Sequence, residues 1–144
     1  MGKKELPHYK KKQQRLHAKD ARPEDLRRQG EEFLQAGWLS DAIDFFGKAG
    51  DQNGLEKVRD IAISEGDAFL FRRTLKALDA TASEGQWKEL ADRALDLGKL
   101  QFAREGYRMA GDRKSLDEVD RLINPEAEEA PEAEPEKEPE EEPE

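Results

Sequence analysis

The sequence predicts an all-α fold of about three antiparallel helix hairpins followed by a C-terminal capping helix. Three observations support this prediction. The chain contains an internal repeat, its apolar side chains recur at helical spacing, and no segment sustains the period of two that indicates a β-strand. We expect the folded domain at residues 23–124, flanked by a basic head at 1–22 and an acidic tail at 125–144.

The internal repeat is the strongest signal in the chain. The segment 23–63, shifted by 61 positions, lies on 84–124 without a gap, and nine of the 41 pairs are identical. Average composition would give two or three identities, at roughly 6% for each position. The identical pairs are Leu34/Leu95, Gly37/Gly98, Leu39/Leu100, Ala42/Ala103, Ala49/Ala110, Gly50/Gly111, Asp51/Asp112, Leu55/Leu116 and Val58/Val119. They fall on apolar and turn positions, as expected for a repeated structural unit.

The first two predicted helices span 23–36 and 39–49. Pro23 suits a first helical position, and Glu24 complements the dipole of the helix N-terminus. The second helix carries apolar residues at i, i+3, i+4, i+7 and i+10, and Gly50 suits the left-handed position after its end. Its apolar stripe consists of Leu39, Ala42, Ile43, Phe46 and Ala49.

Five further helices follow from the same signals. Gly66-Asp67 stops one helix and caps the next, Ser83 and Gln86 form a capping-box pattern, and Pro125 ends the series. The predicted helices are about 54–65, 67–79, 84–97, 99–110 and 113–123. Short turns make sequential helices antiparallel neighbours. A helix with a single apolar stripe cannot form a core alone, so stacked helix pairs predict an α-solenoid.

The spacing of the first hairpin resembles the tetratricopeptide repeat, which places bulky, small and aromatic residues at fixed positions on two helices. The matching residues are Leu26, Gly30, Phe33, Ala42, Phe46 and Ala49, and in the second copy Trp87, Leu90, Ala91, Ala103, Tyr107 and Ala110. The chain is also similar to the degenerate helical repeats of vesicle-coat and intraflagellar-transport subunits. The resemblance implies a right-handed α-solenoid in which the first helix of each hairpin lines a concave groove.

By this resemblance, the groove would be the partner-binding site. Its residues would be Arg27, Glu31, Leu34, Glu56, Asp60, Ile63, Lys88, Asp92 and Leu95. This surface is mixed and leans acidic, so we expect it to prefer a basic or amphipathic segment docked as a helix in a groove.

The two ends of the chain carry opposite charge. Residues 1–22 hold eight basic and two acidic residues, whereas residues 125–144 hold eleven glutamates and one lysine. The tail has no large apolar side chain, which predicts disorder, and the head is expected to be largely disordered or partly helical. The head could contact nucleic-acid phosphates. Head and tail could also associate, although salt screens exposed charges beyond about 8–10 Å.

The sequence offers no catalytic constellation. It has no cysteine, its two histidines, His8 and His17, lie in the basic head, and no glycine-rich phosphate loop follows a strand. We therefore predict no catalytic, cofactor-binding or metal-binding residues and no small-molecule substrate. No membrane span or signal peptide is evident, so a cytoplasmic location is expected.

These observations favour a non-catalytic protein–protein interaction module, an adaptor or assembly factor whose partner is another protein. The alternative is a nucleic-acid or ribosome-associated factor that uses residues 1–22.

Overall fold

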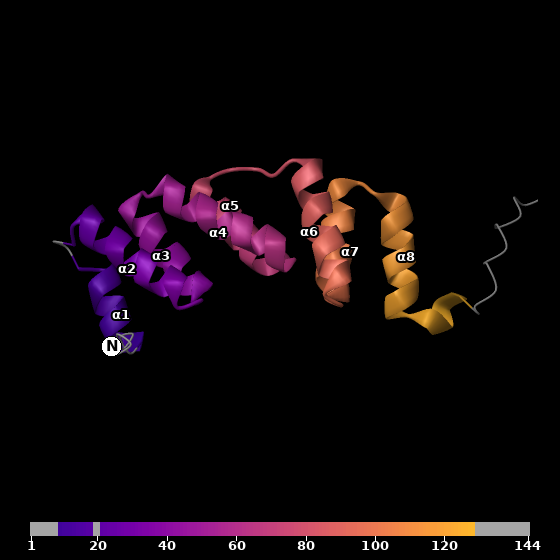
Figure 1. Ribbon diagram of the computed structural model, residues 1–144, viewed down its shortest axis with the longest axis horizontal. Helices are drawn as coiled ribbons and strands as arrows, with labels where there is room; N and C mark the ends of the chain where they lie inside the picture. The colour runs from indigo at the N-terminus through magenta and orange to yellow at the C-terminus, as the bar shows by residue number, and fades with distance from the viewer. Residues whose placement is uncertain (1–8, 19–20, 129–144) are drawn as a thin grey trace, which may run out of the picture.

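The computed structural model describes residues 9–18 and 21–128, and all regular structure in these ranges is helical (Figure 1). The elements are α1 (Tyr9–Leu16), α2 (Pro23–Gln35), α3 (Leu39–Ala49), α4 (Gln52–Glu65), α5 (Ala68–Leu78), α6 (Glu84–Asp96), α7 (Leu100–Ala110), α8 (Arg113–Ile123) and the 3-10 helix η1 (Pro125–Glu128). This arrangement confirms the all-α prediction. The acidic residues beyond 128 and the start of the basic head lie outside the described ranges.

The internal repeat reappears in the helix boundaries. Helices α2, α3 and α4 begin at residues 23, 39 and 52, and α6, α7 and α8 begin at 84, 100 and 113. Each helix of the second copy thus begins 61 residues after its counterpart. Helix α5 lies between the two copies.

Three glycine–aspartate pairs end one helix and begin the next. Each glycine adopts a left-handed backbone conformation, and each aspartate accepts a hydrogen bond from a backbone N–H in the following first turn. The pairs are Gly50–Asp51, Gly66–Asp67 and Gly111–Asp112. Glycine adopts this conformation without a Cβ penalty, and the carboxylate satisfies an N–H that the helix leaves unpaired.

The hairpins α2/α3, α4/α5 and α6/α7 pack against one another in chain order. The first helices are in contact from α2 to α4 to α6, and the second helices from α3 to α5 to α7. We call α2, α4 and α6 the first layer, and α3, α5 and α7 the second layer. In Figure 1 the hairpins follow one another along the long axis of the molecule. Helix α8 packs on α7 at one end, and α1 packs on α3 at the other.

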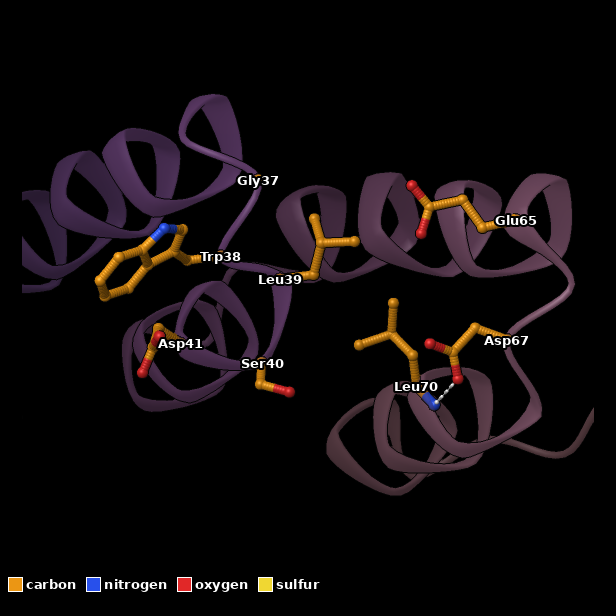
Figure 2. Close-up of a pocket in the computed structure, with 8 residues that line it drawn as sticks. All are labelled: Gly37, Trp38, Leu39, Ser40, Asp41, Glu65, Asp67 and Leu70. Atoms are coloured by element: carbon orange, nitrogen blue, oxygen red, sulfur yellow. Dashed lines mark hydrogen bonds between the residues drawn. The ribbon is translucent and has the colours of Figure 1, made fainter.

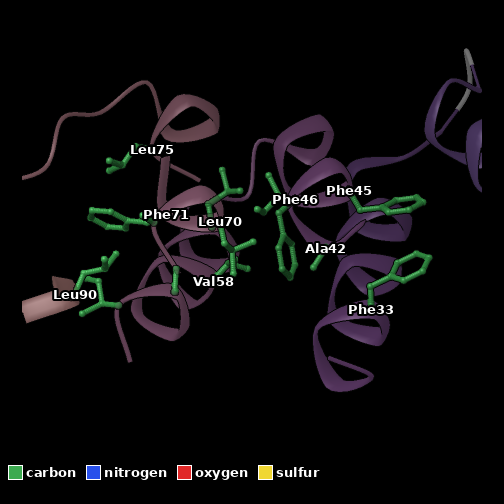
Figure 3. Packing of buried hydrophobic residues seen from close by; sticks show 14 of the residues in the cluster. Phe33, Ala42, Phe45, Phe46, Val58, Leu70, Phe71, Leu75 and Leu90 are labelled. Atoms are coloured by element: carbon green, nitrogen blue, oxygen red, sulfur yellow. The ribbon is translucent and has the colours of Figure 1, made fainter. Parts of the chain in front are cut away.

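The core runs between the two layers. Figure 3 shows its buried side chains from Phe33 through Phe46 and Phe71 to Leu90. Phe71 meets Trp87 edge-to-face at a centroid distance of 4.7 Å, which joins α5 to α6. Aromatic pairs in this geometry add stability beyond the area they bury.

Glycines allow the helices of the first copy to approach closely. An ideal Cβ at Gly30 would lie 2.7 Å from the Phe46 ring, and one at Gly54 would lie 2.5 Å from it. The ring is fully buried and occupies the space that both missing side chains leave. In the second copy, the close approach involves Gly106, whose Cβ would lie 2.7 Å from the Ala91 side chain.

Helix α8 closes the C-terminal end of the helix array. Val119 is fully buried, and Leu116 and Ile123 pack beside it against the α6–α7 hairpin. Most of the other residues of α8 are charged, and Leu122 is the large apolar side chain left exposed on this helix. A terminal helix with a polar outer face protects the preceding core from water. Across the described ranges, every helix is too short or too polar to cross a membrane.

Candidate functional site

The nine residues predicted to line the groove lie on α2, α4 and α6, three on each helix. The apolar members belong to the hydrophobic core. Ile63 is buried, and Leu34 and Leu95 are half-buried and pack against buried core residues. The six polar members lie at the surface: Arg27, Glu31, Glu56, Asp60, Lys88 and Asp92. Any contact of the predicted site with a partner therefore depends mainly on these six polar groups.

Two of the predicted residues form the same ion pair in the two copies. Arg27 Nε lies 3.3 Å from Asp51 Oδ2, and Lys88 Nζ lies 3.7 Å from Asp112 Oδ2. Both aspartates cap the next helix of their copy. Hydrogen bonds from Ser115, helped by nearby Lys88, lower the pKa of Asp112, so its carboxylate stays ionised at more acidic pH than an ordinary aspartate.

Two further predicted residues are tied to neighbouring helices. Lys57 Nζ donates to Glu31 Oε1 at 3.0 Å, which links α4 to α2. The Tyr107 hydroxyl donates to Asp92 Oδ1 at 2.6 Å, which links α7 to α6. Burial and the hydrogen bond to Asp92 raise the pKa of Tyr107 well above its ordinary value, so the phenol remains a proton donor. By contrast, the ion pair of Asp60 within the described part of the chain is with its sequence neighbour Arg59 and joins no second helix.

The two layers differ in charge. The first layer carries eleven acidic and six basic residues, a net charge of −5, whereas the second carries three acidic and six basic residues, a net charge of +3. Helix α1, which packs on the second layer, adds four basic residues and no acidic one. The excess of acidic residues expected for the predicted groove therefore extends to all three helices of the first layer.

A shallow hollow of about 410 Å³ lies between the α2–α3 turn and the α4–α5 turn (Figure 2). Leu39 and Leu70 form apolar walls, and the carboxylates of Asp41, Glu65 and Asp67 line it. Among the residues that the structure describes, no basic side chain lines this hollow. Asp67 is engaged with the backbone N–H of Leu70 at 2.9 Å, as the dashed line in Figure 2 shows.

The described carboxylates do not form a metal centre. Within residues 9–18 and 21–128, no group of three or more His, Asp or Glu side chains is arranged to hold a metal ion. Of the two histidines, His17 lies exposed directly after α1, and His8 is outside the described ranges. The acidic side chains in these ranges lie on helix faces and at turns, and the buried Asp51 is held by its cap and by Arg27.

Sequence reasoning missed an ion-pair cluster that fixes α1 to the second layer. Lys12 forms ion pairs with Asp41 and Asp44, and Arg73 on α5 pairs with Asp44 as well. Burial lowers the pKa of Lys12, but the hydrogen bonds to the two aspartates outweigh burial, and the pKa is raised overall. One turn later Leu16 is buried in the core. The sequence carried no apolar period that would signal this docking, because Leu16 is the one buried apolar residue of α1.

Comparison with known proteins finds no matching family model, no matching curated protein and no matching solved structure. The tetratricopeptide-like resemblance therefore depends on residue spacing alone.

Proposed function

We propose that this protein is a non-catalytic interaction module, a right-handed tetratricopeptide-like α-solenoid whose first layer binds a basic segment of another protein. The observation that carries the proposal is the separation of charge between the two layers. A binding surface with one prevailing sign attracts partners of the opposite sign and disfavours the others. We propose a cytoplasmic adaptor or assembly factor as the setting for this activity.

The first layer holds carboxylates that are available to a partner. Those without an ion pair are Glu24, Glu56, Glu65, Glu84, Glu89 and Asp96. They are distributed over all three helices of the layer, so a basic segment lying across α2, α4 and α6 would meet several of them. Exposed pairs each contribute little, about 0–1 kcal/mol, so binding on this surface depends on several contacts made together.

The acidic hollow in Figure 2 lies at the edge of the first layer, where the end of α4 at Glu65 meets the starts of α3 and α5, and it has room for one long basic side chain. Leu39 and Leu70 can pack against the methylene groups of a lysine or arginine, while Glu65 and Asp67 face its charged end. Lysine and arginine bury their aliphatic stems in this way and keep the charge near water. The hollow thus supports recognition of a basic amphipathic segment.

The proposal is tested with a basic amphipathic helical peptide of about four turns, leucines on one face and lysines on the other, titrated by fluorescence anisotropy. The double variant Glu56→Lys/Asp60→Lys should weaken binding about tenfold or more at low salt. The matched control Asp117→Lys/Glu118→Lys makes the same charge change on α8 and should bind like the wild type. Equal losses in both variants, or no loss in the first, would contradict the proposal.

A second function is supported by α1. Lys10, Lys11 and Arg15 on this helix are exposed and make no ion pair, whereas Lys12 is already bound to the second layer. We propose as the alternative that residues 1–22 grip nucleic-acid phosphates. Binding of a single-stranded RNA oligonucleotide should then fall steeply with salt and weaken in Lys10→Glu/Lys11→Glu. Salt-independent binding would exclude this alternative.

A further inference from the structure

A second hollow, of opposite character, opens between α1, α3 and α5 on the second layer. Its volume is about 520 Å³. Leu16, Ile43, Gly47 and Ala77 supply apolar surface, and these residues come from all three helices. We call this site the α1–α3–α5 hollow. It exists because the ion pairs of Lys12 hold α1 against α3.

The lining of the hollow is cationic. Lys48 and Lys76 are exposed at its edge, and neither forms an ion pair. The only carboxylate in the lining is Asp44, which is already paired with Lys12 and Arg73. The hollow therefore offers apolar surface next to unpaired positive charge, whereas the charged side chains that line the hollow in Figure 2 are negative.

Gly47 is independent evidence that the α1–α3–α5 hollow is left open for a ligand. It lies inside α3, where glycine costs about 1 kcal/mol of helix stability relative to alanine. Gly30 and Gly54 are explained by the Phe46 ring, which fills the space of a side chain. At Gly47 an added Cβ would meet no atom within 4 Å. Packing among residues 9–18 and 21–128 thus gives no reason for a glycine at that position.

We propose that the α1–α3–α5 hollow binds an acidic amphipathic segment of a partner protein. An apolar side chain of the segment packs on Leu16, Ile43 and Gly47. Its flanking carboxylates pair with Lys48 and Lys76. The site lies on the opposite layer from the acidic surface and takes the opposite charge, so the module joins two different partner segments.

The composition of the competing occupants favours a partner peptide. The chain's own tail, 125–144, supplies eleven glutamates but no large apolar side chain to fill the apolar surface. Nucleic acid supplies phosphates, but single-stranded bases need aromatic platforms, and among the described residues the lining has no Phe, Tyr or Trp and a single imidazole, that of His17. An acidic peptide with leucine or phenylalanine matches both the charge and the apolar surface.

The test uses the full chain and a labelled helical peptide of about four turns, with leucines on one face and glutamates on the other. Gly47→Leu should fill the hollow and weaken binding at least about tenfold. Leucine favours the helix more than glycine does, so this variant should stay folded. Lys48→Glu/Lys76→Glu should weaken binding to a similar extent, while Arg113→Glu/Lys114→Glu on α8, the matched charge change, should not.

Three results would overturn the proposal. The first is unchanged binding in Gly47→Leu with the helical circular dichroism retained. The second is equal binding of a peptide with the sequence of residues 125–144, because that peptide has no large apolar side chain. The third is displacement of the acidic peptide by a single-stranded RNA oligonucleotide that binds Gly47→Leu as tightly as the wild type, which would indicate a nucleic-acid surface.

Discussion

The two copies of the repeat, α2–α4 and α6–α8, share their boundaries but fill their interiors differently. In the first copy the Phe46 ring occupies the space beside Gly30, and the contact is entirely apolar. In the second copy the corresponding residues are Tyr107 and Ala91, and the tyrosine hydroxyl donates to Asp92. The turns between helices therefore fix where each helix begins, while the space between helices accepts two different packing solutions.

The largest expected effect comes from moving a residue of the second copy into the first. Gly30→Ala introduces the side chain that Ala91 carries, but its Cβ would lie 2.7 Å from the Phe46 ring. Shifting the buried ring should cost about 1–3 kcal/mol. The gain of about 1 kcal/mol in helix propensity offsets part of this cost, so we expect a net loss of up to about 2 kcal/mol in the free energy of unfolding. Urea unfolding followed by circular dichroism measures it.

A smaller side chain at position 46 should relieve the contact. The double variant Gly30→Ala/Phe46→Leu should lose less free energy of unfolding than the two single changes added together. The Ala91→Gly variant provides the matched change in the second copy and should cost about 1 kcal/mol through helix propensity. If Gly30→Ala stabilises the protein, the account of the close approach in the first copy is wrong.

The next effect concerns the hydrogen bond that only the second copy has. Tyr107→Phe removes the donor to Asp92 and should cost about 1 kcal/mol at neutral pH. Tyr9→Phe is the control, since Tyr9 is 73% exposed and should be neutral.

This hydrogen bond also predicts a pH dependence at alkaline pH. The pKa of Tyr107 is raised in the folded chain, so above about pH 10 the unfolded chain loses this proton while the folded chain still holds it. The stabilisation is therefore complete below about pH 10 and declines as the pH rises toward the folded-state pKa. The stability difference between the wild type and Tyr107→Phe should shrink between about pH 10 and 11. A constant difference would show that Tyr107 contributes packing alone.

Much of the fold could be predicted from local signals. Each glycine–aspartate pair specifies a helix end and the next helix start within two residues, and the apolar stripes have a single helical period. Helix boundaries such as 39–49 and 113–123 followed from these signals and are confirmed. The role of Leu16 could not be read in the same way, because one buried leucine in a basic segment has no period. Leu16 reaches the core because the ion pairs of Lys12 hold α1 against α3, and the partners of Lys12 lie about 30 residues away in the sequence.

The candidate sites were harder to predict because they depend on contacts between helices. The resemblance placed nine residues on three successive first helices, and the structure locates them there. It did not indicate that Arg27 and Lys88 pair with capping aspartates, because those aspartates lie beyond the hairpin, at the start of the following helix. The α1–α3–α5 hollow needs α1 in place, and its most informative residue, Gly47, is unusual only once the neighbouring space is known. Whether the nine residues bind a partner stays a prediction.

The smallest expected effect tests whether the repeated ion pair is equivalent in the two copies. Arg27→Ala and Lys88→Ala each remove the cation beside a capping aspartate, and both cations are about half exposed. Each change should therefore cost less than about 1 kcal/mol, and salt should reduce the cost of both. The two costs should agree within about 0.5 kcal/mol in urea unfolding at low salt. A clearly larger cost for Arg27→Ala would mean that this arginine holds α2 to α4 in a way that Lys88 does not reproduce between α6 and α8. In that case the copies would differ in how successive helices are joined as well as in how their interiors are filled.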